Sequence, residues 1–181
     1  MINLKQPTLR ARLTDAIVLS IFGAMLVISQ VALSFLPNIE LVSTLIIILT
    51  MVYGKKAFCP IYIFVAAEGL IFGFGLWWIC YLYVWAVLAV TVLALRKIKS
   101  CVFWAIVSAI FGLLFGTLCS IPTFIVMGFS GGVAYIISGI SFDLIHCAGN
   151  FIVTLALFKP LYSVLAVLNG RVKNHFSPKI S

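Results

Sequence analysis

Long apolar stretches follow one another along almost the whole chain, separated by short breaks that contain glycine, proline or charged residues. A stretch of about 20 apolar residues can cross the hydrocarbon core of a membrane as a helix. Six stretches are expected to be such helices, at approximately residues 16–36, 41–53, 60–72, 77–95, 101–121 and 133–158. We therefore predict an all-α integral membrane protein, a bundle of six transmembrane helices forming a single domain over residues 1–181.

Two connecting segments carry further predictions. Residues 122–132 contain no charge and are expected to form a loop outside the membrane, with Pro122 as a stop or kink. Residues 161–168 follow the last stretch, and because they are apolar we expect them to lie along the membrane surface.

Composition supports the membrane assignment. Hydrophobic residues make up 64% of the chain and charged residues only 9%, whereas soluble domains are about half apolar and a quarter charged. The first stretch is longer than the apolar part of a typical signal peptide and lacks a small-residue cleavage pattern, so no cleaved signal is expected.

The basic residues indicate the orientation of the bundle. All twelve fall in four clusters, namely Lys5, Arg10 and Arg12; Lys55 and Lys56; Arg96, Lys97 and Lys99; and Lys159, Arg171, Lys173 and Lys179. Each interval between clusters fits a hairpin of two helices, which places every cluster on one side. Lysine and arginine in short loops stay cytoplasmic, so both termini are predicted to be cytoplasmic. The net charge of +8 therefore reflects topology and not nucleic-acid binding.

The five cysteines give no sign of a functional site. They are scattered and show no Cys-x-x-Cys spacing, and the positions are Cys59, Cys80, Cys101, Cys119 and Cys147. We interpret them as small apolar packing residues, so that neither a disulfide nor a metal site is predicted, and no cofactor is expected.

The four acidic residues each need an explanation in so apolar a chain. Asp15 is expected to cap the first helix. Glu40, in the first outer turn, is either solvated or a ligand contact. Glu68 lies near the outer end of the third helix, and Asp143 lies near mid-membrane in the sixth.

Asp143 shares a helical face with His146 and Asn150, at spacings of three and seven residues. Lipid cannot solvate this face, so it must point into the bundle. It forms either an internal network that holds helices together or the polar floor of a ligand site.

An aromatic group follows the glycine-containing break at residues 73–75, and its members are Trp77, Trp78, Tyr81 and Trp85. Trp77 and Trp78 also suit an interfacial belt. Trp85 lies about two turns deeper. Together with Tyr135, at the outer start of the sixth helix, these side chains suit a concave site for a large ligand with flat and polar parts.

Small residues recur every four positions on the first helix, at Ala16, Ser20 and Ala24. Such a pattern lets another helix approach closely. It indicates either packing within the bundle or docking against another protein.

Three segments resemble a known family. They are residues 35–42 (FLPNIELV), residues 73–78 (GFGLWW) and residues 142–146 (FDLIH) with Asn150. With six helices and the small-residue pattern, they are similar to the S component of an energy-coupling factor (ECF) transporter, over nearly the whole chain. Ser20 departs from the all-alanine pattern of that family.

The resemblance implies a multi-pass protein of the bacterial cell membrane that captures a vitamin from outside. A transmembrane coupling protein, docked on Ala16, Ser20 and Ala24, and two ATPase subunits would supply the energy. The chain has no Gly-x-x-x-x-Gly-Lys-[Ser/Thr] loop, so we expect it not to be an enzyme. Substrate contacts are expected from the outer turn, the aromatic group and the internal polar residues, namely Asn38, Glu40, Glu68, Trp77, Trp78, Tyr81, Trp85, Tyr135, Asp143 and His146.

The charges expected at the outer face limit the class of substrate. No arginine or lysine faces outward to hold a phosphate or carboxylate, which disfavours phosphorylated and acidic vitamins. Cobalamin or its precursor cobinamide is favoured by the resemblance, and a queuosine precursor or another neutral heterocycle is the alternative.

Two other classes stay open. A structural or assembly subunit would bind no small molecule. An intramembrane serine protease would use Ser130, in the sequence Gly-Phe-Ser-Gly, with His146 as base. Ser130 is expected in the outer loop, about 20 Å along the axis from His146, whereas nucleophile and base must lie within hydrogen-bond reach.

Overall fold

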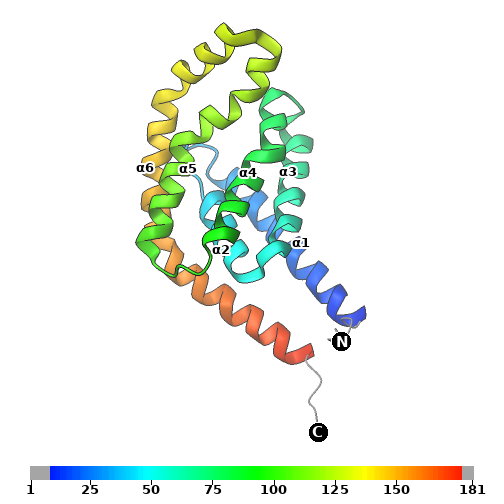
Figure 1. Cartoon of the computed structure of the whole chain (residues 1–181). Coiled ribbons are helices and arrows are strands. Elements are labelled where there is room, and N and C mark those ends of the chain that lie inside the picture. The colour runs from blue at the N-terminus through cyan, green and yellow to red at the C-terminus, as the bar shows by residue number, and fades with distance from the viewer. Residues whose placement is uncertain (1–8, 177–181) are drawn as a thin grey trace, which may run out of the picture.

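The computed structural model describes residues 9–176, without the side chains of residues 11, 12 and 171–176. In this part of the chain all regular structure is helical (Figure 1). The elements are α1 (Leu9–Ala32), α2 (Val42–Tyr53), the 3-10 helix η1 (Gly54–Ala57), α3 (Phe58–Phe72), α4 (Leu76–Leu95), α5 (Cys101–Cys119) and α6 (Ile121–Phe176). The all-α prediction is therefore confirmed.

Five helical segments are long and apolar enough to cross a membrane, because α2, η1 and α3 run together as one. These segments are Leu13–Ala32, Val42–Phe72, Leu76–Leu95, Cys101–Cys119 and Ile121–Gly170. The predicted second to fifth helices agree with α2 to α5 within two residues at each end.

Helix α1 begins earlier and ends earlier than predicted. Residues 33–36 form turns in place of a last helical turn, since the residue before Pro37 is disfavoured in the helical region. Asn38 then has a positive φ of 58°. Because α1 starts at Leu9, Asp15 lies inside the helix, and the prediction that it caps the helix is wrong.

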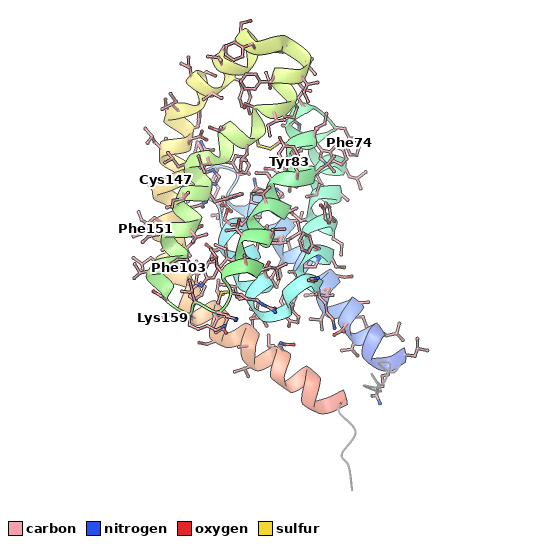
Figure 2. The ribbon with its side chains drawn as sticks, viewed as in Figure 1. Phe74, Tyr83, Phe103, Cys147, Phe151 and Lys159 are labelled. Atoms are coloured by element: carbon pink, nitrogen blue, oxygen red, sulfur yellow. A yellow bond between two sulfur atoms is a disulfide. The ribbon has the colours of Figure 1, made fainter. Side chains whose placement is uncertain are left out.

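The described basic residues lie at one end of the bundle, which we call the basic end. Asp15 of α1 forms an ion pair with Lys56 of η1. The Lys99 Nζ, after α4, lies 5.4 Å from the centroid of the Tyr162 ring on α6. These contacts join α1 to η1 and the end of α4 to α6, and Figure 2 shows Lys159 at the same end. Lys5 and Lys179 lie outside the described residues, as do the side chains of Arg12, Arg171 and Lys173.

Helix α2 forms the centre of the bundle. It contacts α1, α4, α5 and α6, and Ile46, Ile47 and Ile48 are fully buried although they point in different directions around the helix. A helix that is apolar all round is stable only when neighbours cover it completely. This explains how a helix of 12 residues fits among longer ones.

The prediction of a loop at residues 122–132 is wrong, because α6 already begins at Ile121. Pro122 occupies the first turn of the helix, where its missing N–H costs no hydrogen bond, and the Phe124 N–H donates to the Ser120 carbonyl. Gly128 has a φ of 72°, which bends the chain. In Figure 1 this yellow-green segment forms an arch beyond the rest of the bundle. We call residues 121–132 the α6 arch.

Helix α6 also continues past the predicted end at residue 158, through Pro160 to Phe176. Its last part, orange in Figure 1, extends along the basic end. Leu165 is buried there, and the Asn169 side chain donates to the Val52 carbonyl at 3.3 Å. These contacts hold the last part of α6 against the bundle, whereas residues 161–168 were expected to lie along the membrane surface. The sequence near residue 165 gives no sign of such contacts.

Two cysteines form a disulfide, so the prediction of packing roles for all five is wrong. Cys80 of α4 and Cys119 at the end of α5 are bonded, with their Cα atoms 5.0 Å apart (Figure 2). Close by, the Tyr83 hydroxyl donates to the Leu118 carbonyl at 2.7 Å. Both links lie opposite the basic end, since α4 starts there. The other three cysteines are free.

Candidate functional site

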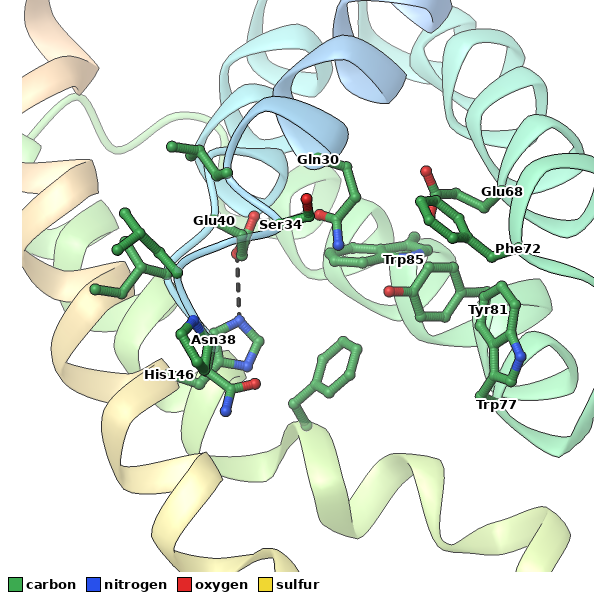
Figure 3. Close-up of a pocket in the computed structure, with 15 residues that line it drawn as sticks. Gln30, Ser34, Asn38, Glu40, Glu68, Phe72, Trp77, Tyr81, Trp85 and His146 are labelled. Carbon is green, nitrogen blue, oxygen red and sulfur yellow. Dashed lines mark hydrogen bonds and ion pairs between the residues drawn. The ribbon is translucent and has the colours of Figure 1, made fainter.

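A cavity of about 340 Å³ lies at the end of the bundle opposite the basic end (Figure 3). Seven of its fifteen lining residues belong to residues 33–40, which connect α1 to α2. The others come from α1, α3, α4, α5 and α6. The cavity is thus a partly open hollow, lined by helices and by one connecting segment, residues 33–40, which we call the α1–α2 connection.

Five rings form one wall of the cavity, and we call them the aromatic arc. Trp77, Tyr81 and Trp85 succeed one another at four-residue steps on α4, with centroids 5.2 and 5.4 Å apart. Phe115 of α5 follows at 5.6 Å from Trp85, and the His146 ring of α6 lies 5.0 Å from Phe115. Helical spacing on α4 and packing of three helices therefore create a continuous aromatic surface.

Glu40 fastens the α1–α2 connection to the bundle. Its Oε1 lies 3.3 Å from the His146 Nε2, and its Oε2 accepts from the Ser43 N–H at 2.8 Å. Glu40 and His146 are 8% and 5% exposed. Burial raises the pKa of Glu40, but the hydrogen bonds and the charge of His146 outweigh it and lower the pKa overall. A buried hydrogen-bonded pair therefore ties the α1–α2 connection to α6.

Glu68 differs from Glu40 because one of its carboxyl oxygens is buried without a hydrogen-bond partner. It is 2% exposed, and its Oε1 has no hydrogen-bond partner. The Trp85 Nε1 is likewise buried without a partner. Both residues line the cavity and lie on the same side of it in Figure 3. Buried polar groups are nearly always hydrogen-bonded, and here an acceptor and a donor that lack partners lie buried in two residues of one cavity wall.

Two residues of the predicted polar floor lie outside the cavity lining. The Asp143 Oδ1 accepts from the Gly116 N–H of α5 at 3.0 Å. The Asn150 Nδ2 donates to Ser43 Oγ and to the Ser108 carbonyl, both at 3.3 Å. These bonds join α6 to α5 and α2. Asp143 and Asn150 therefore form the internal network that holds helices together, which was the alternative to a polar floor of a ligand site. Of the three predicted side chains only His146 reaches the cavity.

Two predicted aromatic contacts also lie elsewhere. The Trp78 Nε1 donates to the Val65 carbonyl at 2.9 Å, which turns its ring toward α3. Tyr135 is exposed beyond the cavity. Asn38, Trp77, Tyr81 and Trp85 do line the cavity.

Phe72, Phe115 and Gln30 line the cavity although sequence reasoning did not select them. The phenylalanines are indistinguishable in sequence from the other apolar residues of their helices. Gln30 did carry a signal, because an uncharged amide near the end of an apolar stretch needs a polar partner or water.

The small residues of α1 face away from the bundle. Ala16, Ser20 and Ala24 are all exposed, whereas Leu19, Phe22 and Leu26, on another face of the helix, are buried. The pattern therefore does not serve packing within this chain.

Ser130 belongs to the α6 arch and does not line the cavity that contains His146. No three His, Cys, Asp or Glu side chains within the described ranges converge so as to hold a metal ion. No protein-family model, no curated protein and no solved structure matches this chain.

Proposed function

We propose that this protein is the substrate-capturing subunit of an ECF-type importer in a bacterial cell membrane. The observation that carries the proposal is the cavity opposite the basic end, with its aromatic arc and its polar atoms that lack partners. An aromatic hollow with a few convergent polar groups is the usual form of a small-molecule site. A purely structural subunit gives no reason to keep Glu68 buried and unpaired.

The orientation follows from two independent features. If α2 and α3 cross the membrane separately, cytoplasmic placement of the basic end would give six crossings with both termini inside, and it would leave the cavity at the outer surface. The Cys80–Cys119 disulfide lies at that same outer end. Disulfides persist in oxidising compartments and are rare in the cytosol, so charge and cysteine chemistry support the same topology.

Energy would come from other subunits. The chain carries no phosphate-binding loop of the Gly-x-x-x-x-Gly-Lys-[Ser/Thr] type. A transmembrane coupling protein is proposed to dock on Ala16, Ser20 and Ala24, whose exposure supports that role, and two ATPase subunits would complete the importer.

The cavity volume bears on the substrate. About 340 Å³ is near the lower end of the range for small-molecule sites. A corrinoid is several times larger and would require the α1–α2 connection to open. The volume therefore favours a small heterocyclic micronutrient over cobalamin or cobinamide.

Thermal unfolding in detergent with a panel of vitamins and heterocyclic precursors tests this function. A ligand at a hundredfold excess over its Kd stabilises the folded state by about 2.7 kcal/mol. For a chain of this size that is a rise in Tm of about 5 to 11 °C. A panel that produced no shift would support the structural-subunit alternative.

A further inference from the structure

The two carboxyl groups of the cavity differ in their partners. Glu40 is hydrogen-bonded to His146, whereas no lysine or arginine lines the cavity beside Glu68. None of the fifteen residues that line the cavity is lysine or arginine. The described lysines and arginines lie at the basic end or in its flanking helices. A carboxylate in such a wall needs a positive partner from elsewhere.

Protonation of Glu68 does not remove the deficit. A protonated carboxyl would turn one oxygen into a donor, and that donor would also lack an acceptor. In either state the Glu68 Oε1 is missing a hydrogen-bond partner, and Glu68 is one of the residues that line the cavity.

The neighbouring Trp85 Nε1 adds a second requirement. As an indole N–H it can only donate. A molecule that satisfied this wall would therefore present an N–H group to Glu68 and an acceptor atom to Trp85. Ring nitrogens and exocyclic amino groups of heterocycles provide this combination on one edge.

The aromatic arc adds a third. Aromatic faces attract cations as well as flat rings. Figure 3 shows Tyr81 and Trp77 on the same side of the cavity as Glu68, with Phe72 between Tyr81 and Glu68, so a ring packed against Tyr81 would lie on the side of the carboxyl.

The geometry points to a flat, positively charged ligand, a protonated amino-heterocycle or amidine, whose N–H groups donate to Glu68 while its ring packs on the aromatic arc. This inference rests on the proposed function, because it names the substrate class of the same cavity. It differs from both earlier expectations, cobalamin or cobinamide and the alternative of a neutral heterocycle.

Three probes of one shape and different charge test the inference: 2-naphthamidine, 2-naphthamide and 2-naphthoate. Equilibrium dialysis with the detergent-solubilised protein would give the Kd of each. The amidine should bind at least about tenfold more tightly than the amide, as one charge-assisted hydrogen bond predicts, and the carboxylate should bind most weakly. Equal or tighter binding of the amide or the carboxylate would overturn the inference.

The variant Glu68→Gln tests whether Glu68 causes the preference for the amidine over the amide. It should reduce the preference for the amidine over the amide to less than about threefold and leave the Kd of the amide nearly unchanged. Ser138→Ala, an exposed position on α6 away from the cavity, should keep the full preference. Retention of the preference in Glu68→Gln would overturn the role of Glu68. If this variant does not fold, the charge series on the unaltered protein still decides the question.

The vitamin panel separates this inference from the proposed function. If a panel member raises the Tm but none of the three probes binds, or if that member is anionic, the cationic class is wrong and the capture function stands. If neither the panel nor the probes bind, the capture function itself is wrong.

Discussion

Helix α5 approaches the backbone of α6 closely at Gly112, beside His146. A Cβ atom added to Gly112 would lie 2.9 Å from the carbonyl carbon and oxygen of His146 and 3.0 Å from the Cys147 nitrogen. Ordinary contacts begin at 3.4 Å, and backbone atoms cannot rotate away. Gly112→Ala should therefore force α6 away from α5 by about half an ångström at His146.

The expected magnitude combines two opposing effects. Alanine favours a helix over glycine by up to about 1 kcal/mol, whereas overpacking costs about 1–3 kcal/mol. The net loss of up to about 2 kcal/mol would lower the Tm by up to about 8 °C. Because the Glu40–His146 distance is already 3.3 Å, a shift at His146 breaks this bond and weakens the closure of the cavity, raising the Kd of a captured ligand by about tenfold.

Gly139→Ala is the matched control. It makes the same substitution on α6, but no atom lies within 4 Å of the added Cβ, so its Tm should be equal to that of the wild type or higher. Both variants would be compared by thermal unfolding with and without ligand. If Gly112→Ala were as stable as Gly139→Ala and bound ligand equally well, the close contact between α5 and α6 would be refuted.

Three further predictions concern other parts of the chain. Ala16→Leu combined with Ala24→Leu should prevent copurification of the coupling protein and spare ligand binding, while Gly139→Leu should do neither; full recovery of the partner would place the docking face elsewhere. Alkylation of the denatured, unreduced protein should label Cys59, Cys101 and Cys147 only, and labelling of Cys80 or Cys119 would disprove the disulfide. The lowered pKa of Glu40 contributes stability that is present above its ordinary value of 4.5 and is lost as the pH falls through the lower folded value. Acidification below pH 4.5 should thus lower the Tm of the wild type more than that of Glu40→Gln, and equal losses would remove Glu40 from this role.

Hydropathy predicted most of the fold because lipid-crossing helices need long apolar stretches whose ends are marked by charge or glycine. The breaks at Gly54 and at residues 73–75 are of this kind, and α2 to α5 begin and end where expected. The α6 arch could not be predicted, since an apolar run of residues 121–127 is equally suited to a loop in the interface and to a short helix. Only Gly128, with its positive φ, marks the bend.

The candidate site was predicted in part for similar reasons. The four-residue spacing of Trp77, Tyr81 and Trp85 determines that they share a face of α4, and the structure brings them to the cavity. Asp143 and His146 also share a helical face, yet Asp143 reaches Gly116 while His146 reaches Glu40. Asp143 can reach the backbone of α5 because residue 116 is a glycine, and the spacing of residues along α6 cannot reveal where the glycines of α5 lie.

The disulfide illustrates the same limit. Cys80 and Cys119 are 39 residues apart in sequence, and nothing in the spacing pairs them in preference to the other three cysteines. Their pairing follows from the antiparallel packing of α4 and α5, which places the start of one helix beside the end of the other. Once that packing is known, their common outer location supports the orientation that the basic residues indicate.

Native mass spectrometry tests most directly the central claim that the cavity captures a small molecule. The protein would be purified from bacterial membranes in mild detergent, together with Trp77→Ala, which alters a cavity residue that is 37% exposed and so leaves the core packing intact. The account predicts a bound small molecule on the wild type that is absent or strongly depleted on Trp77→Ala. A bound molecule retained equally by both proteins, or a wild type that remains unoccupied even after incubation with the vitamin panel, would contradict it.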